Sequence, residues 1–106
     1  MKIQLFILFF LSTAAYSFGQ VSIKGRIKDH QQNLSFATVT LLNPDSSTIK
    51  TVSANDYGEF IFENVSPGLY MVSSSVVGYS KFLSGHISVE NTNIVLADII
   101  LKEATT

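Results

Sequence analysis

The sequence predicts an all-β fold, either an antiparallel sandwich or a small barrel. Apolar and polar residues alternate along several short segments, which is the period of a half-buried strand. Turn residues interrupt these segments about every 8 to 12 positions, a spacing typical of all-β domains. Beyond the first 20 residues no apolar repeat has helical spacing, and Val, Ile, Thr and Ser are common where a helix would favour Ala, Leu, Glu and Lys.

Length and composition indicate one small domain and exclude several classes of partner. The chain has 106 residues, 46% of them hydrophobic, which suits one compact core. Its formal net charge is −1 and its basic residues are not concentrated, so we expect no binding to nucleic acid or to an anionic membrane surface. It contains no Cys, so side-chain packing rather than disulfides must hold the fold together.

Residues 1–19 have the pattern of a secretory signal peptide. A basic residue precedes an uninterrupted apolar run at 5–11. A run of this length suits export, whereas a stable membrane span needs about 20 apolar residues, so an uncleaved anchor is the weaker alternative. Ser17 and Gly19 supply the small residues that signal peptidase prefers, which predicts cleavage before Gln20. We expect no membrane span in the chain that remains.

Seven strands are expected after the signal peptide. Each is a short segment of alternating or continuous apolar character, bounded by polar residues or by Gly and Pro. The seven segments are 21–28, 35–43, 48–54, 59–65, 69–77, 80–90 and 94–101.

The first predicted strand places apolar residues on one side and cations on the other. Val21, Ile23, Gly25 and Ile27 share the inward side, and Lys24, Arg26 and Lys28 share the outward side. Charges on an exposed edge discourage pairing with another chain, so we interpret these cations as protection of an edge strand. A docking edge for a partner strand is the functional alternative.

The second and fourth predicted strands supply most of the expected core face. Their inward positions are Ala37, Val39 and Leu41 in the second and Phe60 and Phe62 in the fourth. Between the third and fourth strands, we expect Asn55 or Asp56 to bond back to the turn and Gly58 to take the left-handed conformation that closes it.

Two further breaks separate the remaining strands. Ser66–Leu69 has the composition of a type II turn, with Pro67 at the second position and Gly68 at the third, where φ must be positive. The fifth strand is the longest apolar one, and Gly78-Tyr79 interrupts the pattern before the last hairpin.

The order of these elements resembles a known family. The segments "GRIKD", "NLSFATVTL" and "ANDYGEFIFENVSPGLYMVSSSVVGY" resemble the carboxypeptidase regulatory-like domain, whose pattern is roughly G-x-V/I-x-D, P-L-x-x-A-x-V-x-L, T-x-x-x-G-x-F-x-F, L-x-P-G-x-Y and G-Y. The resemblance implies a seven-stranded antiparallel Greek-key β-sandwich of the transthyretin-like or carbohydrate-binding-like type over 20–106. The main departures are Asn33, where the family often has Pro, and Val65, where Leu is usual.

The resemblance assigns roles in the fold rather than in chemistry. It implies strand, turn and core positions, and the label "carbohydrate-binding-like" describes architecture rather than activity. The matching positions are Gly25, Ala37, Gly58, Phe60, Phe62, Pro67, Gly68, Tyr70, Gly78 and Tyr79.

A module of this kind directly behind an export signal is similar to the N-terminal extension of TonB-dependent outer-membrane receptors of Bacteroidetes-like bacteria. There it lies on the periplasmic side, ahead of a plug and a barrel. The resemblance implies export to the periplasm, or to the periplasmic face of the outer membrane, of a Gram-negative bacterium. The implied partners are envelope proteins or the receptor barrel. The sequence leaves open whether the chain is a receptor fragment, the product of a degraded gene or a free-standing protein.

No residue pattern predicts catalysis, a cofactor or a metal site. His30 and His86 lack the spacing of zinc ligands, and Asn55-Asp56 lacks the alternating oxygen ligands of a calcium loop. The serine run 73–75 is outside any G-x-S-x-G elbow. Transthyretin-like hydrolases of 5-hydroxyisourate end in Tyr-Arg-Gly-Ser, whereas this chain ends in "LKEATT".

Tyr57 is the one candidate ligand contact. Aromatic side chains beside polar turns stack on sugars in many carbohydrate modules, and Tyr57 is expected at a turn tip. The family pattern instead implies core positions for Tyr70 and Tyr79, with their hydroxyl groups at the rim. We therefore expect a non-catalytic interaction or spacer module, with a soluble glycan- or peptide-binding module as the alternative and a hydrolase far behind.

Overall fold

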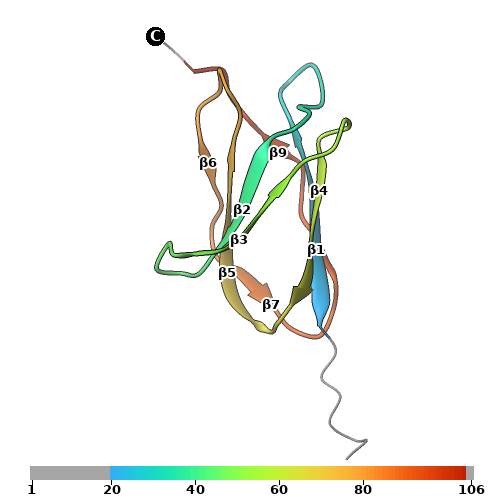
Figure 1. The fold of residues 1–106 in the computed structure, drawn as a ribbon, viewed down its shortest axis with the longest axis vertical. Coiled ribbons are helices and arrows are strands. Elements are labelled where there is room, and N and C mark those ends of the chain that lie inside the picture. The colour runs from blue at the N-terminus through green and yellow to red at the C-terminus, as the bar shows by residue number, and fades with distance from the viewer. Residues whose placement is uncertain (1–19, 105–106) are drawn as a thin grey trace, which may run out of the picture.

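The described part of the chain contains only strands and loops (Figure 1). The structure is a computed structural model that describes residues 20–104, so the predicted signal peptide at 1–19 lies outside the described residues. Its strands are β1 (Val21–Lys28), β2 (Thr38–Leu42), β3 (Thr48–Ser53), β4 (Glu59–Val65), β5 (Gly68–Ser75), β6 (Phe82–Leu83), β7 (Ile87–Val89), β8 (Ile94–Val95) and β9 (Ile99–Ile100). No helix in this part of the chain is long and apolar enough to cross a membrane.

The strands form two sheets that pack face to face (Figure 1). The first sheet has the order β4-β1-β8, and β9 also pairs with β1. The second has the order β3-β2-β5-β6, and β7 also pairs with β5. The predicted all-β sandwich is confirmed.

The last two predicted strands are each divided in two. Segment 80–90 forms β6 and β7, because Ser84 leaves the ladder and bonds Val72 twice: its amide donates to the Val72 carbonyl (2.8 Å), and its hydroxyl accepts from the Val72 amide (2.8 Å). Segment 94–101 forms β8 and β9, both of which run parallel to β1. All other pairings between these strands are antiparallel.

The interpretation of β1 as an edge strand is wrong. β1 is the central strand of the first sheet, with β4 on one side and β8 and β9 on the other. The cations Lys24, Arg26 and Lys28 therefore lie in the middle of a sheet face, where alternation turns them away from the core. Alternation along one strand shows which face is buried and not which neighbours the strand has.

The core is a single apolar cluster between the two sheets. Apart from Gly25, the residues predicted to face inward in segments 21–28, 35–43 and 59–65 belong to it: Val21, Ile23, Ile27, Ala37, Val39, Leu41, Phe60 and Phe62. The rings of Phe60 and Phe62 meet edge to face with their centroids 5.7 Å apart. Phe60 also covers Gly25, its partner on β1, so closely that a Cβ there would lie 2.5 Å from the ring.

The edges β3 and β4 lie on the same open side of the sandwich, and both are irregular. Ile49 is an extra residue in the pairing of β3 with β2, and the pairing of β4 with β1 shifts at Asn64, whose φ is 57°. The Lys50 ammonium group spans the gap between the sheets and donates to the Glu63 carbonyl (2.7 Å). Bulges and a lysine are typical protection for sheet edges.

The corner between β4 and β5 differs from the predicted type II turn. Gly68 has a φ of 159°, far from the value of about +80° that the third position of such a turn requires. The Tyr70 hydroxyl instead donates to the Ser66 carbonyl (2.6 Å), so a side chain closes the corner. The ring of Tyr70 packs against the core, as the family pattern implied.

The opposite end of the sandwich is built around Gly58. Its carbonyl accepts from the Ile27 amide (2.7 Å), and its φ is 75°. A Cβ at this position would lie 2.3 Å from the Ile27 carbonyl oxygen and within 3.2 Å of the Leu34 backbone. The turn after β3 is therefore packed against both β1 and the loop that follows it.

Asp29 connects that loop to the last third of the chain. Its carboxylate accepts from the amides of Gln31 (2.7 Å) and Gln32 (2.8 Å) and from the Tyr79 hydroxyl (2.7 Å). These bonds lower the pKa of Asp29, and the bond from the Gln31 amide has the largest effect. The bond to Asp29 in turn raises the pKa of Tyr79. The backbone of Tyr79 also forms an isolated antiparallel β-bridge with Glu103. Hydrogen bonds therefore connect three segments of the chain at this end of the sandwich.

Truncation of the buried rings should unfold the protein far more readily than truncation of their exposed neighbour. Phe60→Ala and Phe62→Ala should each lower the free energy of unfolding by about 3 to 5 kcal/mol, since each ring fills space in the core. Ile61→Ala, between them but 38% exposed, should cost less than about 1 kcal/mol. Chemical denaturation measures all three, and a loss below about 1 kcal/mol for either Phe would contradict the inward face.

Gly58→Ala should destabilise the protein although it adds only a methyl group. The left-handed φ and the nearby carbonyl predict a loss of about 2 kcal/mol or more. Gly85→Ala is the matched control, because a Cβ at Gly85 meets nothing within 4 Å. The melting temperatures of both variants check this, and equal values would show that the turn has room to move.

The Asp29 network should weaken in acid. Because the pKa of Asp29 is lowered by folding, its stabilisation is present above the ordinary value of 3.8 and is lost as the pH falls through the lowered value. Asp29→Asn should therefore unfold more easily than the wild type at about pH 7, and the difference should shrink by about pH 2.5. Urea titrations at both pH values measure this, with the exposed Asp98→Asn as control. A difference that persists in acid would contradict a role for the charge.

Candidate functional site

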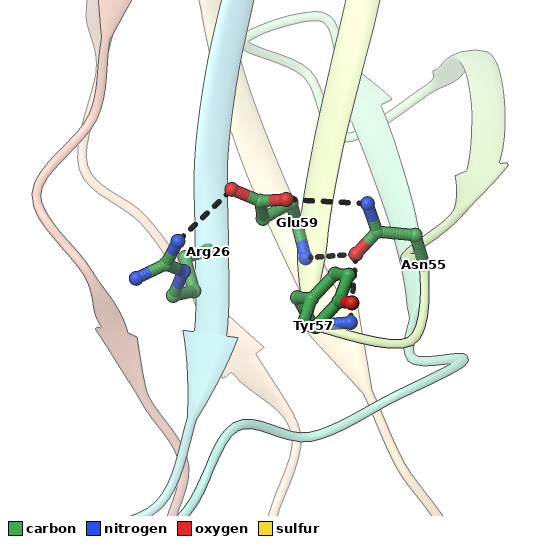
Figure 2. Close-up of polar contacts among 4 residues, drawn as sticks. All are labelled: Arg26, Asn55, Tyr57 and Glu59. Carbon is green, nitrogen blue, oxygen red and sulfur yellow. Dashed lines mark hydrogen bonds and ion pairs between the residues drawn. The ribbon is translucent and has the colours of Figure 1, made fainter.

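The candidate site is the turn at Asn55–Glu59 with the neighbouring part of β1 (Figure 2). The Asn55 side-chain oxygen accepts from the backbone amides of Tyr57 (2.9 Å) and Glu59 (2.9 Å). The Asn55 backbone closes the same turn, because its carbonyl accepts from Gly58 and its amide donates to Glu59. Asn55 therefore has the turn role that the sequence predicted, and its oxygen is already occupied.

An ion pair borders the turn. Arg26 Nη2 lies 2.9 Å from Glu59 Oε2, and the side-chain nitrogen of Asn55, Nδ2, donates to Glu59 Oε1 (3.3 Å) (Figure 2). These contacts lower the pKa of Glu59, and the bond from Arg26 has the largest effect. The carboxylate is thus held ionised, which makes Glu59 a hydrogen-bond acceptor rather than a proton donor near neutral pH.

An open groove runs from this turn along the edges of β3 and β4. Its volume is ≈ 590 Å³, and both Asn55 and Glu59 line it. The other lining residues are Lys24, Gly25, Val52, Ser53, Phe60 and Ile61. The groove is a shallow depression with mixed polar and apolar walls, and Phe60 is the one aromatic residue among those that line it.

Tyr57 projects from the turn tip and is 66% exposed. It is not among the residues that line the groove, so it presents a free ring at the end of the sandwich. Phe36, in the preceding loop, is 68% exposed. Phe36 was not among the candidates predicted from the sequence. The available signal was its position out of phase with the inward residues Ala37 and Val39.

The other predicted candidates lie elsewhere. His30 and His86 are exposed, and no group of three or more His, Cys, Asp or Glu side chains within 20–104 is arranged to hold a metal ion. Ser73 and Ser74 are buried in β5. Tyr79 packs against the core, and its hydroxyl bonds Asp29.

The remaining motif residues form the frame of the fold. Gly25 lies under the Phe60 ring, and Ala37 is buried. Pro67 and Gly68 lie at the β4–β5 corner, and Gly78 takes a φ of 90° before Tyr79. The arrangement at the Asn55–Glu59 turn is therefore suited to holding a surface contact, through an exposed ring beside fixed polar groups.

Solved structures share this fold at low sequence identity. A chain of the cohesin–X-dockerin complex from Acetivibrio cellulolyticus matches with a TM-score of 0.65 and 19% identity over 78% of this chain. The shaft pilin SpaA of Lactobacillus rhamnosus GG matches with 0.63 and 11% over 83%. A suspected carbohydrate-binding protein from Pseudomonas aeruginosa matches with 0.52 and 14% over 80%. No curated protein sequence matches the chain.

This chain covers a different share of each structural neighbour. This chain spans 58% of the cohesin–dockerin chain and 47% of the pilin, but 93% of the Pseudomonas protein. The model of the carboxypeptidase regulatory-like domain matches residues 22–102, which include all nine strands from the second residue of β1 onward. The chain therefore belongs to the family of carboxypeptidase regulatory-like domains.

Proposed function

We propose that this chain is a non-catalytic, exported β-sandwich module that acts as a periplasmic interaction or spacer domain of a TonB-dependent outer-membrane receptor. The observation that carries the proposal is the separation of the two ends of the described chain (Figure 1). β1 begins beside Val65, at the β4–β5 end. The Ala104 amide donates to the Gly78 carbonyl, next to the Tyr79–Glu103 bridge at the opposite end.

This geometry suits a spacer. β1 has eight residues, and a strand rises by about 3.3 Å per residue, so the ends of the module are separated by roughly 25 Å along the sheet. Because β1 is hydrogen-bonded to β4 on one side and to β9 on the other, the module should resist being stretched along this direction. A chain that enters at one end and leaves at the other extends a receptor away from its barrel, which is what a spacer requires.

The side chains support a non-catalytic role. The carboxylates of Asp29, Asp45 and Glu59 are each engaged by turn or ion-pair contacts that lower their pKa. A general acid near neutral pH needs the opposite shift. The fold neighbours include a cohesin–dockerin complex and a pilus shaft subunit, which are protein assemblies. This supports protein contacts in the cell envelope as the working role.

A free-standing glycan- or peptide-binding module is the second candidate. The exposed ring of Tyr57 favours it, as does the fold similarity to the suspected carbohydrate-binding protein of Pseudomonas aeruginosa.

Export provides the test of the receptor-domain proposal. The full chain, expressed in a Gram-negative host, should appear in the periplasmic fraction, and mass spectrometry should show that the mature protein begins at Gln20. Leu8→Arg, which interrupts the apolar run, should leave the protein uncleaved in the cytoplasm, whereas the conservative Leu8→Ile should not. A wild-type chain that stays full-length and cytoplasmic would contradict the proposal.

A further inference from the structure

Phe36 has a costly conformation without a packing reason for it. Its φ is 60°, in the left-handed region that bulky residues rarely adopt, and its side chain is 68% exposed. A non-glycine residue in this region is strained, and the strain persists only where the surrounding structure compensates for it. A glycine at this position would be free of the strain. The Phe36 ring is largely exposed, so its burial offsets little of the strain. Such a residue indicates a purpose outside the fold itself.

Tyr57 lies on the loop next to Phe36. The Ala54 amide donates to the Ala37 carbonyl (2.8 Å), which joins the segment before the Asn55–Glu59 turn to the residue after Phe36. Gly58 packs against the backbone of Leu34, two residues before Phe36. The two loops are thus bonded together at the end of the sandwich opposite the β4–β5 corner (Figure 1). Two largely exposed aromatic residues, Phe36 and Tyr57, therefore come from two loops that are joined at this end of the sandwich.

Both rings are held by a rigid backbone. Tyr57 is fixed by the Asn55 side chain and by the docking of Gly58 on Ile27. Phe36 is fixed by its conformation and by the buried Ala37 that follows it. Aromatic side chains on a fixed backbone lose little conformational entropy when they bind a ligand.

The surroundings of the rings indicate the chemical class of the ligand. The rings stand on open loops, whereas apolar anchors of peptides favour well-packed pockets. Each ring has an exposed polar residue directly before it in the sequence, Ser35 before Phe36 and Asp56 before Tyr57. The turn that carries Tyr57 also holds the fixed Arg26–Glu59 pair. A ligand with a flat apolar face and a polar edge suits this arrangement, and a sugar ring has that form.

We propose that Phe36 and Tyr57 form an aromatic platform on which the rings of a glycan stack. Asp56 and the Arg26–Glu59 pair provide hydrogen-bonding groups for hydroxyls at the edge of the sugar. The platform deepens the second candidate function and does not depend on export or on a receptor, so the two proposals fail separately.

Affinity electrophoresis of the purified full chain tests the platform. The gels contain laminarin, mannan, xylan, dextran, pullulan or chondroitin sulfate. At least one polysaccharide should retard the wild type, and Phe36→Ala and Tyr57→Ala should each weaken that binding by about tenfold or more, as the loss of a main aromatic contact predicts. Leu69→Ala is the control, because Leu69 is also exposed but lies at the β4–β5 corner.

Two outcomes of this experiment would overturn the proposal. One is an unretarded wild type in every gel. The other is retardation that both aromatic variants retain, which would place the sugar elsewhere. If only a displayed peptide library binds to the platform, the ligand class is wrong even though the surface is functional.

The conformation of Phe36 gives a second, independent measurement. Phe36→Gly and Phe36→Ala should both weaken the binding by about tenfold or more, but their melting temperatures should differ. Glycine removes the strain at this φ and alanine retains it, so the Gly variant should melt above the Ala variant and no lower than about the wild type. If both variants melt several degrees below the wild type, the ring is part of the core and the proposal fails.

Discussion

The docking of Gly58 on Ile27 is the contact on which the rest of the structure depends. It joins the turn before β4 to the central strand of the first sheet, and it leaves no space for a side chain. From this fixed point, alternation along β4 sends Phe60 and Phe62 into the core. The same point turns Tyr57 to solvent and sets Glu59 opposite Arg26. The fold and the candidate site therefore share one anchor.

The sequence predicted the local elements well because their causes are local. Alternation identified the inward residues, and the Asn55–Gly58 turn followed from residues that bond their own backbone. The position of β1 in its sheet depends on partners about 35 and 70 residues away, such as Phe60 and Ile94, which no pattern within the strand reports. The prediction of a type II turn at the β4–β5 corner was wrong for a different reason. Gly68 has a φ of 159°, and the hydroxyl of Tyr70, four residues along the chain from Ser66, closes the corner instead.

The candidate site was predictable only in part. Tyr57 follows from the turn, since residues at a turn tip point to solvent. Phe36 does not, because an aromatic residue in an apolar segment is more often buried, and nothing in the sequence shows a positive φ at that position. The sequence predicted a turn role for Asn55, and it did not predict the ion pair of Glu59 with Arg26. In the structure Asn55 and Glu59 are occupied with each other and with Arg26, so they stiffen the surface that the rings occupy.

The irregular edge strands β3 and β4, which the Lys50–Glu63 contact joins, affect how the protein behaves when many copies are close together. A sandwich without disulfides is held together only by packing, and brief openings expose strand edges that recruit further copies. Here the extra residue Ile49 and the left-handed Asn64 spoil the register that an incoming strand would need. The lysine tether adds a charge at the same place. These two edges are therefore poor templates for a strand from a second copy, even at high protein concentration.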